Sequence, residues 1–101
     1  MESRIDLHNI LCRILGSNNV YFQPPESVKI NYPAIIYSRE KFDTNEADNK
    51  KYILKTKYKI TVVDKNPDSL IPGKIILLPL CSSVTNYKSN DLNHDVFEIY
   101  F

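Results

Sequence analysis

The sequence predicts an α+β domain in which a mainly antiparallel sheet of about four to five strands packs against an amino-terminal helix and a second, short or kinked helix. Three observations support this prediction: apolar residues at helical spacing in residues 4–15, alternating side chains in residues 52–64, and further alternating segments near the carboxyl terminus. At 101 residues the chain has the length of one ordinary domain, so residues 1–101 are expected to form a single unit.

The first predicted element is an amphipathic helix over residues 4–15. Its apolar positions share one face: Leu7, Ile10, Leu11 and Ile14. Ser3 is placed to cap the first turn, and Asp6 has the position of the acid in a capping box. Gly16 supplies the left-handed residue at which many helices end.

A short strand is expected at residues 20–23, because Pro24 and Pro25 end it. Residues 26–32 have the composition of a loop. Residues 33–39 are expected to form a strand with both faces mostly buried.

The polar stretch 40–51 contains one apolar residue that could anchor it, Phe42, and a second candidate, Ala47. We expect an extended loop or the tip of a long hairpin, and in a hairpin the strand that begins at Tyr52 pairs with residues 33–39. Loops of this length in compact domains are often functional or mobile.

The clearest strand covers residues 52–64, where alternation separates two sets of side chains. One face carries the larger apolar set: Tyr52, Leu54, Thr56, Tyr58, Ile60 and Val62. The other face carries Lys55, Lys57 and Lys59, with Ile53 and Val63 at its ends. We therefore expect a half-buried strand whose lysine face meets water or a partner and whose other face is covered by a helix.

Asn66 is expected to cap that covering helix, because a proline and an acid follow it. Pro72 and Gly73 should break the helix, so that it kinks or gives way to a second turn over residues 74–78. The last two strands are expected at residues 80–87 and 95–101. The closing strand should place Phe97, Ile99 and Phe101 on one face, against Val96, Glu98 and Tyr100 on the other.

Composition and charge exclude several classes of protein. A net charge of +1 argues against a dedicated nucleic-acid binder, which usually has a basic excess. Neither a signal peptide nor an apolar run of the roughly 20 residues that span a bilayer is present, so the protein should remain where it is made. Cys12 and Cys81 have no disulfide-framework spacing and are expected to be free thiols.

The sequence predicts no catalytic, metal or cofactor site. The chain has two glycines, and neither lies in a phosphate-binding pattern. Four potential zinc ligands lack any recognised spacing: His8, Cys12, Cys81 and His94. A triad of Cys81, His94 and Asp91 lacks a local signature. The acids Asp43, Glu46 and Asp48 lack the regular spacing and central glycine of a calcium loop.

Lys55, Lys57 and Lys59 form a row of positive charges about 7 Å apart on one face of the strand. They could contact phosphates, an acidic partner or the wall of a channel. Alternatively, they keep an exposed sheet face soluble, which is the more common role of strand lysines. The high tyrosine content, 7 of 101 residues, is compatible with an interface or with the edge of a small core.

The order of several short segments resembles the small tail-completion proteins of long-tailed bacteriophages, which are tail terminator or head-tail joining proteins. The segments that carry this resemblance are residues 20–25 (VYFQPP), 32–37 (YPAIIY), 47–49 (ADN) before Tyr52, 58–64 (YKITVVD), 66–69 (NPDS) and 91–97 (DLNHDVF).

The resemblance implies a virion protein without catalysis, which closes into a sixfold ring on the head-proximal end of the tail after assembly in the host cytoplasm. It implies three partners: further copies of the chain, the major tail tube protein and the head connector protein, with DNA only passing through the lumen and no membrane. Residues expected at a subunit or tail interface are Phe42, Asp43, Ala47, Asp48, Asn49 and Tyr52. Lys55, Lys57 and Lys59 would line the lumen or remain an exposed basic face.

Two other functions stay open on the sequence. A head-side connector or stopper subunit shares the size and ring symmetry of a terminator. A monomeric adaptor that binds a protein or a nucleic acid through the lysine face is the second alternative, and salt-dependent DNA binding would favour it.

Overall fold

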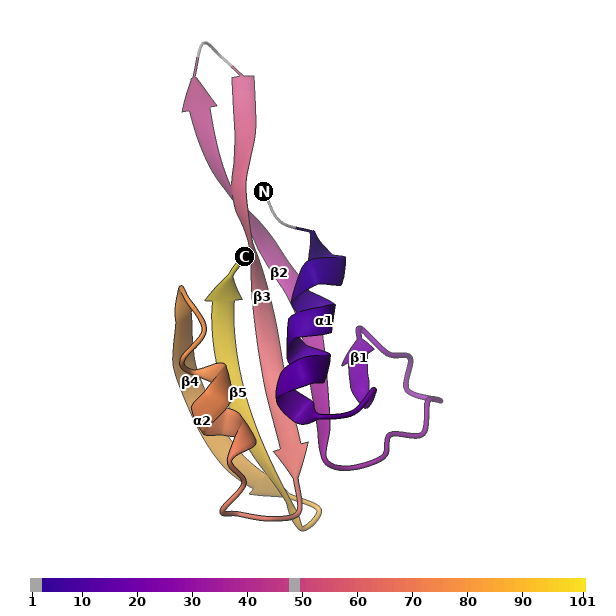
Figure 1. Cartoon of the computed structure of the whole chain (residues 1–101). Helices are drawn as coiled ribbons and strands as arrows, with labels where there is room; N and C mark the ends of the chain where they lie inside the picture. Colours follow the sequence, from indigo (N-terminus) through magenta and orange to yellow (C-terminus); the bar gives the residue numbers. More distant parts are fainter. Residues whose placement is uncertain (1–2, 48–49) are drawn as a thin grey trace.

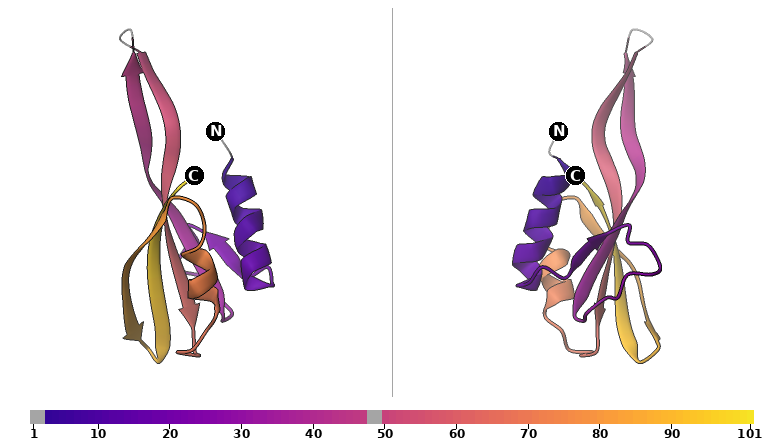
Figure 2. Two further views of the ribbon diagram at one scale, coloured as in Figure 1. Left: turned by 60° about the vertical axis from the view of Figure 1, so that its left-hand side comes forward. Right: turned by 90° about the vertical axis from the view of Figure 1, so that its right-hand side faces the viewer.

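The computed structural model describes residues 3–47 and 50–101, with residues 43–47 and 50–54 described as backbone only. The elements are α1 (Arg4–Leu15), β1 (Val20–Phe22), β2 (Ala34–Ala47), β3 (Lys50–Asp64), α2 (Ile71–Ile75), β4 (Cys81–Ser89) and β5 (Leu92–Tyr100). The strands form one sheet in the order β1-β2-β3-β5-β4, in which β1 is parallel to β2 and every other pair is antiparallel. Both helices lie on the same face of the sheet (Figures 1 and 2). The predicted α+β architecture is therefore confirmed.

Helix α1 has the predicted ends. The Ser3 hydroxyl accepts a hydrogen bond from the amide of Asp6 at 3.3 Å, and the Asp6 carboxylate accepts one from the amide of Ser3 at 3.1 Å, which completes a capping box. Gly16 follows the helix with a φ of +80°, and its amide donates to the carbonyl oxygen of Cys12 at 2.9 Å. Leu7 and Leu11 are fully buried against the sheet.

The two glycines of the chain provide a matched pair for a stability test. We expect Gly16→Ala to lower the free energy of unfolding by about 1 kcal/mol, because alanine is strained at a φ of +80° although no atom lies within 4 Å of its Cβ. Gly73→Ala, inside α2 and equally unobstructed, should raise that free energy by about 0.5 kcal/mol. Urea unfolding followed by circular dichroism measures both, and a loss of stability in both variants would contradict this account.

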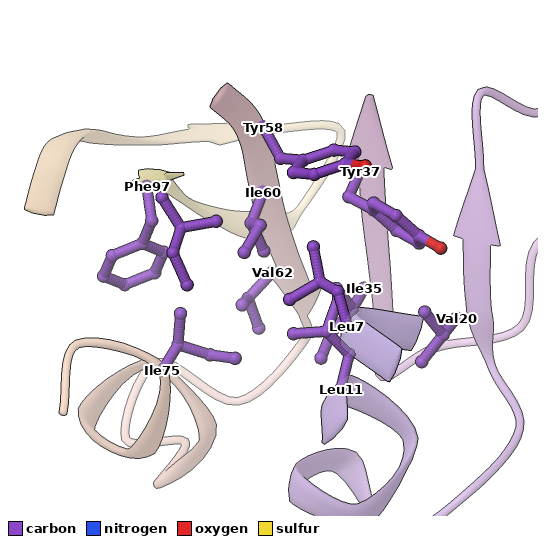
Figure 3. Close-up of a cluster of buried hydrophobic side chains, with 11 residues drawn as sticks. Leu7, Leu11, Val20, Ile35, Tyr37, Tyr58, Ile60, Val62, Ile75 and Phe97 are labelled. Carbon is purple, nitrogen blue, oxygen red and sulfur yellow. The ribbon is translucent and has the colours of Figure 1, made fainter. Parts of the chain in front are cut away.

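The core lies between the helices and the sheet (Figure 3). It is formed by side chains from both helices and from four strands: Leu7, Leu11, Val20, Ile35, Tyr37, Tyr58, Ile60, Val62, Ile75, Phe97 and Ile99. The alternation predicted for the described part of β3 is confirmed, because Thr56, Tyr58, Ile60 and Val62 are all buried. Val63, expected at the end of the exposed lysine face, is also buried, with Ala34 and His94 as its neighbours in the sheet.

The hairpin alternative for residues 40–51 is confirmed, and the extended loop is wrong. Strand β2 continues to Ala47 and pairs with β3 from Ala34↔Val63 to Ala47↔Lys50, with two register shifts. Pairing of β1 with β2 ends at Tyr37, and pairing of β5 with β3 ends at Lys57. Residues 41–47 and 50–56 therefore form a two-stranded extension beyond the body of the domain, which we call the arm (Figure 1).

The second helix begins at Ile71 and not after Asn66. The Asn66 side-chain oxygen accepts from the amide of Asp68 at 3.0 Å, which holds residues 66–69 in a turn instead of a helix. Pro72 then falls in the first turn of α2, where its missing N–H needs no partner, so it does not break the helix. The expected second helical turn over residues 74–78 is absent, because α2 ends at Ile75.

The last two strands are confirmed and are longer or shifted relative to the prediction. Asn90 and Asp91, with φ of 51° and 61°, form the two-residue turn between β4 and β5, as expected for a turn that matches the twist of a hairpin. Strand β4 forms one edge of the sheet and has a register shift between Ser83, opposite Phe97, and Thr85, opposite Val96.

Candidate functional site

An apolar hollow of about 230 Å³ lies on the helix side of the sheet, where the arm leaves the body. Its lining comes from α1, the arm, the α2–β4 connection and the end of the chain: Ile10, Lys55, Leu78, Pro79, Leu80, Ile99, Tyr100 and Phe101. The amide of Phe101 donates to the carbonyl of Thr56 at 2.9 Å, and the amide of Tyr100 donates to that of Leu80 at 3.2 Å. These bonds hold the last residues and the α2–β4 connection against the base of the arm.

Large apolar side chains of the α2–β4 connection are exposed. Leu80, which lines the hollow, is 58% exposed, and Leu77, which precedes the lining residue Leu78 in the chain, is 81% exposed. These leucines are exposed because α2 is short. A helix of five residues makes little more than one turn and buries only Ile75 fully in the core. Such a concentration of exposed leucines is typical of a contact surface.

Phe42 adds an aromatic ring to the same region. It is 43% exposed and lies opposite Thr56, whose buried side chain is on the helix side of the sheet. The guanidinium of Arg39 lies 4.7 Å from the centre of the Phe42 ring. The backbone of Thr56 is hydrogen-bonded to that of Phe101, which lines the hollow, so Phe42 lies one strand away from the hollow. We call Phe42, Leu77, Leu80 and the hollow the arm-base surface.

The other predicted interface residues belong to the arm or lie outside the description. Asp43, Ala47 and Tyr52 are on the paired strands of the arm, where only the backbone is described. Asp48 and Asn49 lie outside the described residues. The structure therefore assigns a side-chain position to Phe42 alone among these six residues.

Of the lysine row, Lys57 and Lys59 lie on the face of β3 opposite to the helices, whereas Lys55 lines the hollow at the base of the arm. Lys55 and Lys59 are exposed, whereas Lys57 contacts the carboxylates of Glu40 at 3.4 Å and Glu98 at 3.1 Å. The hydrogen bond to Glu98, together with the negative charge of Glu98 and the hydrogen bond to Glu40, raises the pKa of Lys57 above its ordinary value despite partial desolvation. The charge of the central lysine is thus largely balanced within the chain.

The groups considered for metal binding or catalysis are not brought together. His8 contacts Tyr37 at the α1–β2 contact, whereas His94 stacks on Tyr87 with ring centres 4.6 Å apart. Cys81 and Asp91 lie at opposite ends of the β4–β5 hairpin. Burial raises the pKa of the Cys81 thiol, which disfavours the thiolate that a nucleophile requires. Among the residues whose side chains the structure describes, no three of His, Cys, Asp or Glu are placed to hold a metal ion.

Phe42 was predicted from the sequence as an interface residue, whereas Leu77 and Leu80 were not. The available signal was the apolar density of residues 70–80, which exceeds what one short helix can bury. Cys12 and Cys81 are both free thiols, as expected, and both are half-buried. No helix in the described part of the chain is long and apolar enough to cross a membrane.

Comparison of the chain with family models, with curated proteins and with solved structures gave no match in any of the three.

Proposed function

We propose that the chain is a structural subunit that forms a ring at the head-proximal end of a phage tail tube, with the six copies that the resemblance implies. In this role it ends tube polymerisation and provides the surface that joins the head. The observation that carries the proposal is the arm beside an apolar hollow: one subunit has both a projecting element and a separate apolar surface. Two different contact surfaces on one subunit give a head-to-tail interface, and such an interface closes into a ring when the rotation permits.

The marginal stability expected of the arm by itself favours assembly with another chain. A two-stranded ribbon without further strands or a covering helix is marginally stable in water. The arm has neither along residues 41–47, because the pairing of β1 ends at Tyr37. Contact with a neighbouring subunit would supply the missing cover, and the exposed Leu77 and Leu80 offer an apolar surface for it.

The proposed partners are further copies of the chain, the major tail tube protein and the head connector protein. The lysine face would line the lumen through which DNA passes. Because Lys57 is paired with Glu40 and Glu98, and Lys55 lines the hollow, the positive field in that lumen would come mainly from Lys59. The proposal assigns no catalysis to the chain.

The test is electron microscopy of lysates after a stop codon is placed early in this gene in its phage genome. We expect overlong tails without heads, because tube subunits would continue to add in the absence of a terminator. The matched control is the same mutant grown in a host that suppresses the stop codon, where normal virions should return.

Two other outcomes would count against the terminator role. Tails of normal length beside separate filled heads would assign the chain to the head-side connector. Unaltered virions would remove it from tail completion altogether.

A further inference from the structure

A polar cluster ties α1 to the sheet within an otherwise apolar contact. Tyr37 of β2 is 1% exposed, yet its hydroxyl lies 2.8 Å from Nδ1 of His8 and 3.1 Å from a terminal guanidinium nitrogen (Nη1) of Arg4. The Arg4 guanidinium also lies 4.4 Å from the centre of the Phe22 ring in β1. The first two turns of α1 are thus joined to β2 through the buried Tyr37 hydroxyl and to β1 through the contact of Arg4 with Phe22.

One arrangement satisfies every donor in this cluster. A guanidinium only donates, so the Tyr37 oxygen accepts from Arg4. With a neutral imidazole whose proton is on Nε2, the Tyr37 O–H donates to Nδ1 of His8, whereas a proton on Nδ1 would leave the Tyr37 O–H without an acceptor in the cluster. Burial raises the pKa of Tyr37, so this hydroxyl stays protonated and keeps its donor role near neutral pH.

The surroundings disfavour a charged His8. The titratable groups that act on the cluster are Arg4 and Cys12 from α1, Tyr37 from β2 and Tyr58 from β3, and none of these is a carboxylate. Desolvation by burial, and then the positive charge of Arg4, lower the pKa of His8 below the ordinary histidine value of 6.5. The folded chain therefore binds this proton less readily than the unfolded chain.

We propose that Arg4, His8 and Tyr37 form a proton-sensitive latch: protonation of His8 breaks its bond with the Tyr37 hydroxyl and releases the first two turns of α1 while the sheet stays folded. A protonated Nδ1 is a donor, so the Tyr37 hydroxyl loses its acceptor and two cations become neighbours. Since the pKa of His8 is lowered, the latch is closed above about pH 6.5 and opens as the pH falls below that value.

The latch connects acidity to the arm-base surface. Ile10, on the same helix as His8, lines the hollow at the base of the arm. The amino-terminal end of α1 lies at the end of the body from which the arm projects (Figure 1). Release of the first turns of α1 would therefore open one wall of the hollow. The latch itself belongs to the single chain and does not depend on the proposed ring.

The test is amide hydrogen exchange of the purified chain by NMR at about pH 7.5 and about pH 5, expressed as protection factors that correct for the intrinsic pH dependence of exchange. We expect the amides of residues 7–11 to lose protection several-fold at the lower pH, while the amides of β3 and β5 keep theirs. His8→Asn should abolish this loss, because the asparagine oxygen can replace Nδ1 as acceptor and cannot be protonated. His94→Asn removes the only other histidine and should behave as the unmodified chain.

Three results would overturn the latch: an equal loss of protection in His8→Asn, no loss in the unmodified chain, or a parallel loss in β3 and β5. If His8→Asn does not fold, Tyr37→Phe replaces it. That variant lacks the hydroxyl, so exchange near α1 should be faster at both pH values with a smaller difference between them. The midpoint pH at which the His8 ring titrates can be followed in the same spectra. In the folded chain it must be lower than the midpoint of the same ring in His94→Asn unfolded in urea, where His8 is the remaining histidine.

Discussion

Replacing Leu11 with alanine is expected to lower the free energy of unfolding by about 3 kcal/mol, the largest single effect on stability that we predict. Leu11 is fully buried, and with Leu7 it is one of two α1 side chains that reach the centre of the core. Alanine would lose the burial of the leucine side chain and leave a cavity between α1 and the sheet, and both terms lower the stability. For a domain whose total stability is typically 5–15 kcal/mol, this loss is substantial.

Urea unfolding followed by far-ultraviolet circular dichroism measures this change. The matched control is Ile5→Ala, which removes a comparable side chain from the exposed side of the same helix and should alter the free energy of unfolding by less than about 0.5 kcal/mol. Equal effects of the two substitutions would show that α1 does not pack through Leu11.

Phe42→Ser should leave the monomer folded and abolish most of the proposed ring. The ring of Phe42 is 43% exposed in the single chain, so its loss costs the isolated fold little. Burial of the part of the side chain that is still exposed would contribute roughly 1 kcal/mol at an interface, which corresponds to about a fivefold change in affinity per contact. Because the same contact repeats around a closed ring, the loss repeats at every interface.

Light scattering after size-exclusion chromatography, together with circular dichroism of the same fractions, measures assembly and folding. Leu80→Ser should act in the same direction, since Leu80 belongs to the same arm-base surface. Val28→Ser is the matched control, because Val28 is exposed in the β1–β2 connection, away from that surface. Rings of undiminished stability in both Phe42→Ser and Leu80→Ser would remove the arm-base surface from the assembly.

Local patterns in the sequence were sufficient for the elements whose determinants are local. Ser3, Asp6 and Gly16 define α1 through contacts within the same helix, and the alternation from Thr56 to Val62 defines β3. The position of Pro72 could not be judged in this way. Whether a proline breaks a helix depends on where that helix starts, and the Asx turn at Asn66 delays the start to Ile71.

The candidate site was predictable only in part, because its parts are distant in the sequence. Phe42 was identified as an isolated aromatic residue in a polar stretch, whereas the hollow combines α1, the α2–β4 connection and the end of β5. The lysine row was identified from its period, yet the carboxylate nearest to Lys57 belongs to Glu98, more than a third of the chain away. Pairing of β3 with β5 creates that contact, and no local pattern encodes it.

The register shift in β4 has a consequence for solubility. This outer strand carries one charged side chain and no proline, so it lacks two of the usual protections against fibre formation. The shift moves Thr85 to the opposite face from the one that unbroken alternation with Ser83 would give it, as their partners Val96 and Phe97 show. An incoming strand from another molecule could match the pleat of only one half of β4. The irregularity thereby discourages open-ended pairing of sheets through this edge.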